Sequence, residues 1–285
     1  MLADPLGRRM LAAMDARELQ SMAQAIAADD PYWENGFLAR ALRLAGADGT
    51  EVREVIEHQL WCTWRQARWA TKKLTREDLG QSLEVTGREW IAETIGKPTI
   101  LIAPMTLCTW DAVESVQHFA RRECGDREIL FYGEDMGSHD ARFVAGDDIT
   151  VLRRISRTLA EGGVFCTYPD FVYRGHPVLP VRMFGVPRPM SSGFAYLAAR
   201  PGVHLLPCLL LRQGETIHAE ICEPILLEDN SEPGGPSFQS LTAQVVASTL
   251  EELIRRAPSQ WLLLPTLSFD APEMAHPPET TQGAA

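Results

Sequence analysis

Apolar residues in the first third of the chain recur at intervals of three and four, which is the spacing of an amphipathic helix. Val52, Ile56, Leu60 and Trp64 show this spacing most clearly. The pattern predicts that residues 1–96 form a helical N-terminal region that packs on the rest of the protein.

Beyond residue 96 the pattern changes to short apolar runs that are bounded by turn residues, as expected of buried strands. The predicted strands are 99–105, 128–133, 163–169, 203–211, 218–225 and 260–265. Helical patterns separate them at 110–123, 149–161, 191–200 and 239–256. This alternation predicts an α/β core over residues 97–270, with a mainly parallel sheet flanked by helices on both faces.

Two segments have the composition of loops. Residues 229–236 (DNSEPGGP) combine Gly, Pro and Asn, which predicts a loop between the last predicted strands and helices. Residues 271–285 are rich in Pro, Thr, Gln and Ala, and we expect a disordered tail there.

Bulk composition excludes several classes of function. With 45% hydrophobic and 23% charged residues, the 285-residue chain is typical of a globular protein. Its net charge of −11 argues against binding to nucleic acid or to anionic membranes. There is no apolar stretch of about 20 residues and no apolar run near the start, so we expect a cytoplasmic protein without an integral membrane anchor. The six cysteines form no CxxC pair, which argues against a metal site and a disulfide framework.

One basic cluster stands out from the acidic background. Arg65, Arg68, Lys72, Lys73 and Arg76 recur at helical spacing beside several tryptophans. They are either a solvated helix face or a surface that receives an acidic partner.

Candidate chemistry lies in the segments that follow the predicted strands, because ligands of open α/β sheets bind beyond the carboxyl ends of the strands. The first strand leads into Thr106, Cys108 and Asp111, and the second leads into His139. The segment after the third strand, 168–185, contains the remaining candidates: Asp170, Arg174, Gly175 and His176.

These blocks, in this order, resemble the bacterial lipid A lauroyl/myristoyl acyltransferases, a branch of the lysophospholipid and glycerolipid acyltransferase superfamily. The resemblance spans about residues 50–265: RRISRTLAEGG (153–163), Pro169-Asp170, Arg174-Gly175 before LPVRMFG (179–185), SSGFAYLAARPG (191–202) and APSQWLLL (257–264). In that family a strand ends in a motif of His, four residues, then Asp or Glu after a Trp. Here Trp110-Asp111 matches the Trp-acid pair, but the histidine position holds Thr106.

The resemblance implies transfer of an acyl group from a thioester, with the histidine as the base and the acidic residue as its partner. A threonine hydroxyl cannot take that role, because it titrates far above neutral pH. The family's usual His and Arg after the C-terminal tryptophan are replaced by Leu263, Leu264 and Pro265, and its N-terminal membrane anchor is missing. These departures point away from a membrane lipid acceptor.

Each candidate residue keeps two interpretations. Asp111 is either a retained catalytic acid or an ordinary helix N-cap, and Thr106 either binds substrate or fills the space of the lost histidine. Cys108 is either an acyl-accepting nucleophile or an inert buried thiol. His139 and His176 are candidates to replace the base, whereas Arg174 fits a phosphate or carboxylate of the substrate.

Three hypotheses follow from the sequence. The first is an acyltransferase of specialised metabolism, without a tightly bound cofactor, that moves an acyl group from a carrier-protein or coenzyme A thioester to a small amine or hydroxyl acceptor. The second is a non-catalytic protein of the same fold that binds an acyl chain or a partner. The third is a repurposed site that uses Cys108 or a relocated histidine. A carrier protein is a possible partner under the first hypothesis.

Overall fold

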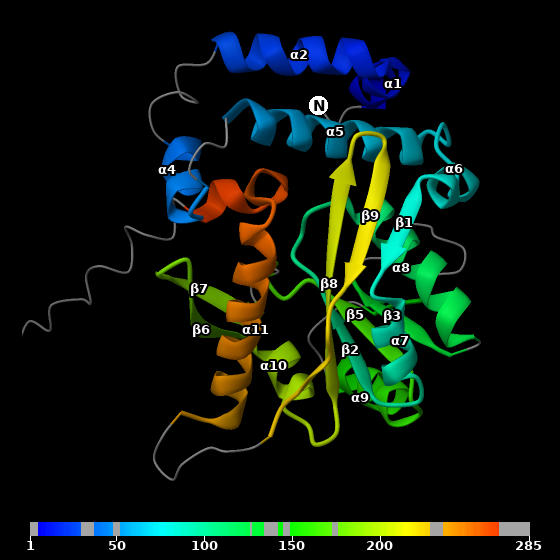
Figure 1. Ribbon diagram of the computed structural model, residues 1–285, viewed down its shortest axis with the longest axis vertical. Helices are drawn as coiled ribbons and strands as arrows, with labels where there is room; N and C mark the ends of the chain where they lie inside the picture. Colours follow the sequence, from blue (N-terminus) through cyan, green and yellow to red (C-terminus); the bar gives the residue numbers. More distant parts are fainter. Residues whose placement is uncertain are drawn as a thin grey trace, which may run out of the picture.

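The N-terminal region is helical, as the sequence predicts. The computed structural model describes residues 5–29, 37–47, 52–125, 127–133, 142–144, 149–172, 176–228 and 236–267. Its first helices are α1 (Pro5–Ala13), α2 (Ala16–Asp29), α4 (Phe37–Leu44), α5 (Val52–Ala70), α6 (Arg76–Gln81) and α7 (Arg88–Thr94). The helix α5 lies between α2 and the upper end of the strands in Figure 1; it packs on α2, and its Trp61 ring contacts Arg212 of β8.

A mainly parallel sheet forms the centre of the molecule. Its strands are β1 (Leu83–Thr86), β2 (Thr99–Ile102), β3 (Ile129–Tyr132), β4 (Arg142–Val144), β5 (Val164–Thr167), β8 (His204–Gln213), β9 (Thr216–Ile221) and β10 (Ile225–Leu226). They are arranged in the order β1-β9-β8-β2-β5-β3-β4, with β10 beside β8. Only the β8–β9 and β8–β10 pairs among them are antiparallel. The predicted fold class is therefore confirmed.

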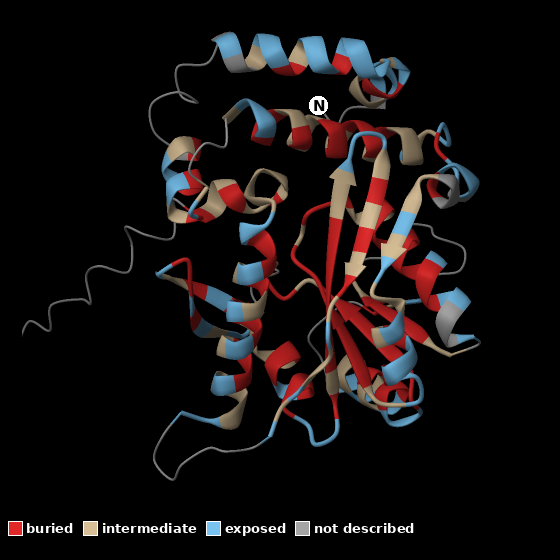
Figure 2. Cartoon of the chain, in the orientation of Figure 1, coloured by how far each residue is buried: buried red, intermediate tan, exposed pale blue. Residues whose placement is uncertain are grey.

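Helices cover both faces of this sheet. On one face, α8 (Thr109–Cys124) packs with α5 and α7 against alternate residues of the central strands. On the other face lie α9 (Ile149–Ala160), α10 (Ser192–Ala198) and α11 (Phe238–Arg255). Figure 2 shows buried residues concentrated on the central strands and on the sides of the helices that face them. Because β2 and β5 are buried along their whole length, their near-continuous apolar sequence is explained.

A separate hairpin was not predicted from the sequence. The strands β6 (Val178–Met183) and β7 (Val186–Ser191) pair with each other and pack on α11. Their turn places Phe184 at φ 54° and Gly185 at φ 74°. Positive φ at both central residues is the geometry of a tight hairpin turn, and glycine adopts it without steric cost.

Two local predictions were wrong. The segment 260–265 is not a strand but belongs to a C-terminal stretch with the 3-10 turns η1 (Pro258–Gln260) and η2 (Leu264–Thr266), each with a proline in its first turn. Residues 83–86, predicted as helix, form β1 and pair with β9. The predicted tail at 271–285 lies outside the described residues, as does most of the predicted loop at 229–236. None of the helices in the described ranges combines the length and apolarity that crossing a membrane needs.

Candidate functional site

A cavity of about 140 Å³ opens at the carboxyl ends of β3 and β5, on the face of the sheet that α9 and α10 cover. Its wall includes the last residue of each strand, Tyr132 and Thr167. Apolar side chains from α9 and α10 complete it, among them Leu152, Phe194 and Leu197. A cleft of this kind at the carboxyl edge of a parallel sheet is the usual position of a ligand site in α/β proteins.

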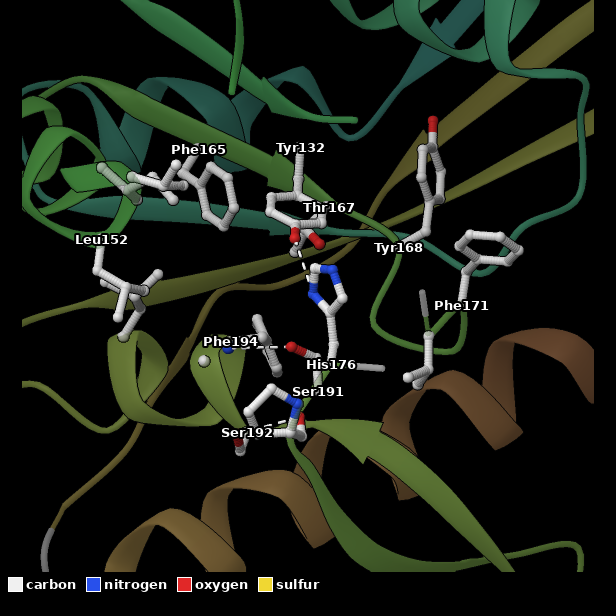
Figure 3. Close-up of a pocket in the computed structure, with 16 residues that line it drawn as sticks. Tyr132, Leu152, Phe165, Thr167, Tyr168, Phe171, His176, Ser191, Ser192 and Phe194 are labelled. Carbon is white, nitrogen blue, oxygen red and sulfur yellow. Dashed lines mark hydrogen bonds between the residues drawn. The ribbon is translucent and has the colours of Figure 1, made fainter. Parts of the chain in front are cut away.

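His176 projects into this cavity. Figure 3 shows its imidazole between Tyr132 and Thr167 on one side and Ser191 and Ser192 on the other. Its Nδ1 lies 3.1 Å from the hydroxyl oxygen of Tyr132. The two rings meet edge to face, with centroids 6.3 Å apart and planes inclined by 83°. In the tautomer that carries its proton on Nδ1, this nitrogen donates to Tyr132 and the lone pair sits on Nε2.

The start of α10 holds the histidine's segment in place. Ser191 is the N-cap of α10, where its hydroxyl accepts a hydrogen bond from the backbone N–H of Phe194 at 3.5 Å. The Ser192 hydroxyl donates to the carbonyl of Pro177 at 3.1 Å. Because Pro177 directly follows His176, this bond ties the histidine to the rim of the cavity.

Asp111 lies elsewhere, in the first turn of α8 and fully buried. Arg65 of α5 grips its carboxylate with two hydrogen bonds of 2.7 Å, one from Nε and one from Nη2. Trp69 donates its indole N–H at 2.7 Å, and the Cys108 thiol donates at 3.4 Å. Among the described residues, no histidine contacts this carboxylate, so its partners are those of a buried ion pair that joins α5 to α8.

This ion pair corrects the interpretation of the basic cluster. Arg65 belongs to neither a solvated face nor a docking surface, because its side chain is only 8% exposed and is bound to Asp111. Arg68 stacks on the ring of Trp64, 4.8 Å from its centroid, and donates to the carbonyl of Lys73. Part of the basic cluster therefore stabilises the packing of α5: Arg65 binds α8, and Arg68 binds the residues just after α5.

Thr106, at the position of the family's histidine, is also buried. Its hydroxyl donates to the carbonyl of Leu210 at 2.5 Å. Its own carbonyl accepts a hydrogen bond of 2.6 Å from Nε2 of His58, a buried residue of α5. Since a carbonyl oxygen can only accept, His58 carries its proton on Nε2 and contributes to holding this loop.

Two thiols lie in the same region. Burial raises the pKa of the Cys108 thiol well above its usual range, and the nearby Asp111 carboxylate raises it further. Burial also raises the pKa of Cys62, with Asp111 as the next cause. A thiol acts as a nucleophile only as its thiolate, so these environments favour neutral, unreactive side chains.

His58 makes the folding stability depend on pH. Burial lowers its pKa from 6.5 to about 4. As the pH falls below 6.5, His58 becomes protonated in the unfolded chain, whereas in the folded protein it stays neutral down to about pH 4. The free energy of unfolding therefore decreases on acidification. We expect the difference in unfolding free energy between the wild type and His58→Gln to shrink by about 2 kcal/mol from pH 7 to pH 5 in urea titrations. A constant difference would contradict a neutral His58.

Asp170 connects three segments rather than facing the cavity. Its Oδ2 accepts hydrogen bonds from the backbone N–H of Met105 at 3.0 Å and from the indole of Trp261 at 2.8 Å. Burial raises the pKa of Asp170 despite these donors. The loop after β2, the loop after β5 and the C-terminal stretch are therefore joined at one carboxyl group.

Three sequence candidates, His139, Arg174 and Gly175, lie outside the described residues. The structure brings His176 to the cavity and gathers Thr106, Cys108 and Asp111 in a separate buried cluster. Sequence reasoning missed Tyr132, although this residue ends a correctly predicted strand. Within the described ranges, no group of three or more His, Cys, Asp or Glu side chains is placed to hold a metal ion.

The fold and the cavity define an α/β protein with a cavity at the carboxyl edge of its sheet. The model of the bacterial lipid A biosynthesis acyltransferase family matches residues 137–267. The match covers 131 of the 285 residues and includes the ordered blocks from 153 to 264 that resemble this family, so it supports that resemblance. The matched residues include His176 and α10 but not the segment from Thr106 to Asp111. No curated protein matches the chain.

Proposed function

We propose that the protein is an acyltransferase that holds the acyl group of a thioester in the cavity and uses His176 as the base. The observation that carries this proposal is the position of His176, inside the cavity and hydrogen-bonded to Tyr132. The donor is a carrier-protein or coenzyme A thioester, and the acceptor is a small amine or alcohol. No tightly bound cofactor takes part.

The chemistry needs one proton acceptor near the reacting carbonyl. The acceptor's nitrogen or oxygen attacks the thioester carbon, and Nε2 of His176 takes its proton. When the tetrahedral intermediate collapses, the C–S bond breaks and the imidazolium returns the proton to the leaving thiolate. Tyr132 orients the ring by accepting a hydrogen bond from Nδ1–H, which is the function that a carboxylate performs in many His-containing sites.

The cluster around Asp111 supports this relocation of the base. Asp111 is fully buried, and its hydrogen-bonding capacity is taken up by Arg65 and Trp69 of α5 and by Cys108. In this proposal Asp111 and Thr106 stabilise the loop after β2 and do not touch substrate.

A second candidate function is favoured by the same ion pair. The protein lacks the motif histidine, and its motif acid, Asp111, is bound to Arg65 in the core. The cavity remains, so in this second proposal the protein binds an acyl group without transferring it. The two proposals differ in turnover alone.

His176→Gln is expected to lower kcat/KM for thioester consumption by about 10²-fold, because glutamine cannot accept the proton. The assay follows loss of thioester absorbance with coenzyme A thioesters of several acyl groups and a small primary amine. Binding of the thioester should be unchanged. His118→Gln is the matched control, because this histidine is exposed on α8 and does not line the cavity.

Full activity of His176→Gln would overturn the role of His176 as the base. Binding of a thioester without consumption by the wild-type protein would instead support the non-catalytic candidate. Tyr132→Phe should keep part of the activity, because it removes the orienting hydroxyl but leaves the imidazole.

A further inference from the structure

The cavity is small for an acyl site. Its volume of about 140 Å³ is close to that of an engineered apolar cavity of about 150 Å³ that binds benzene. A lauroyl chain, with about twice as many carbon atoms as benzene, exceeds this room. The size therefore fits a compact group of one ring.

The inner end of the cavity is closed by the packed core. Ile155, Phe165, Phe194 and Leu197, all of which line it, are each at most 4% exposed and belong to the main hydrophobic cluster. Core side chains are packed as densely as organic crystals, so a longer chain could extend only by displacing them.

Six of the sixteen residues that line the cavity carry an aromatic ring. Tyr132 and His176 meet nearly at right angles, and the other aromatic lining residues are Phe165, Tyr168, Phe171 and Phe194. Figure 3 shows Tyr132 above the imidazole of His176, whereas the ring of Tyr168 points away from it. Aromatic pairs in offset or edge-to-face geometry contribute about 0.5–1.5 kcal/mol beyond their buried area. A flat ring gains this term, whereas a saturated chain does not.

We infer that the acyl group received by this cavity is an aromatic one of about the size of benzoyl, and not a long saturated chain. This inference rests on the proposed function for the identity of the site, but it concerns binding and not turnover. The ring would lie between the aromatic residues and Leu152, with its carboxyl carbon toward His176.

The test compares two unreactive probes, the benzyl and dodecyl thioethers of coenzyme A, by titration calorimetry. The wild-type protein should bind the benzyl probe at least about tenfold more tightly than the dodecyl probe. Leu152→Phe, which narrows the cavity, should weaken the benzyl probe about tenfold. Arg153→Phe is the control, because it adds the same ring at the exposed neighbouring position on α9.

Equal or tighter binding of the dodecyl probe, or an equal effect of the two phenylalanine variants, would overturn the inference. Failure of the proposed function gives a different result. If the benzyl probe binds preferentially but no thioester is consumed, the aromatic preference holds and the catalytic proposal fails. If lauroyl thioester is consumed faster than benzoyl thioester, the catalytic proposal stands and the aromatic preference fails.

Discussion

Asp111→Asn is expected to lower the free energy of unfolding by about 3–5 kcal/mol. The substitution leaves the guanidinium of Arg65 without its counter-charge in a place where neither side chain reaches water appreciably, with exposures of 8% for Arg65 and 0% for Asp111. Denaturant titration monitored by tryptophan fluorescence measures the loss, since Trp69 is bonded to the same carboxylate. The remaining folded protein should consume thioester at the wild-type rate.

The double variant Arg65→Met with Asp111→Leu is the matched control. A buried ion pair can often be replaced by apolar residues at little cost, so this variant should recover much of the stability that Asp111→Asn loses. Asp111→Asn with unchanged stability and abolished turnover would contradict this interpretation. That outcome would show that Asp111 acts in catalysis, as the family motif implies.

The sheet could be predicted from the sequence because its central strands are buried on both faces. The runs at β2, β3, β5 and β8 are mostly apolar, with polar residues only near their ends, and turn residues delimit them. The C-terminal run at 260–265 is equally apolar, yet it forms 3-10 turns. This run is apolar because side chains such as Trp261 are buried in the core, although the run is not part of the sheet.

The hairpin β6–β7 escaped prediction for a related reason. Its strands carry three prolines, Pro180, Pro187 and Pro189, and proline is depleted from strands because it donates no hydrogen bond. In this two-stranded sheet both strands are edges, so prolines are tolerated wherever the N–H would face away from the partner.

The site was only partly predictable. The rule that ligands bind at the carboxyl edge of the sheet selected His176 correctly as a residue near the cavity. The pairing of Arg65 with Asp111 joins residues 46 positions apart, and that of Tyr132 with His176 joins residues 44 apart. Periodicity describes one helix or strand at a time, so it gives no information about which side chains meet across elements.

The carboxyl edge of the sheet thus contains two polar clusters with different surroundings. The cluster under α5, around Asp111 and Thr106, is buried and hydrogen-bonded, and a second cavity of about 160 Å³ lies beside its thiols Cys62 and Cys108. The cluster around His176 borders a cavity that could admit a ligand. Asp170 lies between them and binds both the loop after β2 and Trp261, so the shape of the edge depends on this junction.

Trp261→Ala is expected to lower the free energy of unfolding by about 3–5 kcal/mol, because it empties a fully buried site against Phe184 and Arg188. It also removes one of the donors to Asp170. Trp261→Phe keeps most of the ring volume and loses only the indole N–H, so we expect a smaller loss of about 1–3 kcal/mol.

Urea titrations of the two variants at one pH separate packing from hydrogen bonding at this junction. If both variants lowered the free energy of unfolding equally, packing of the ring would contribute nothing, and the whole effect would come from the hydrogen bond to Asp170. Because Asp170 directly precedes Phe171, which lines the cavity, the Phe variant should also weaken binding of the benzyl probe at temperatures where it stays folded. Unchanged binding would show that the cavity keeps its shape without this hydrogen bond.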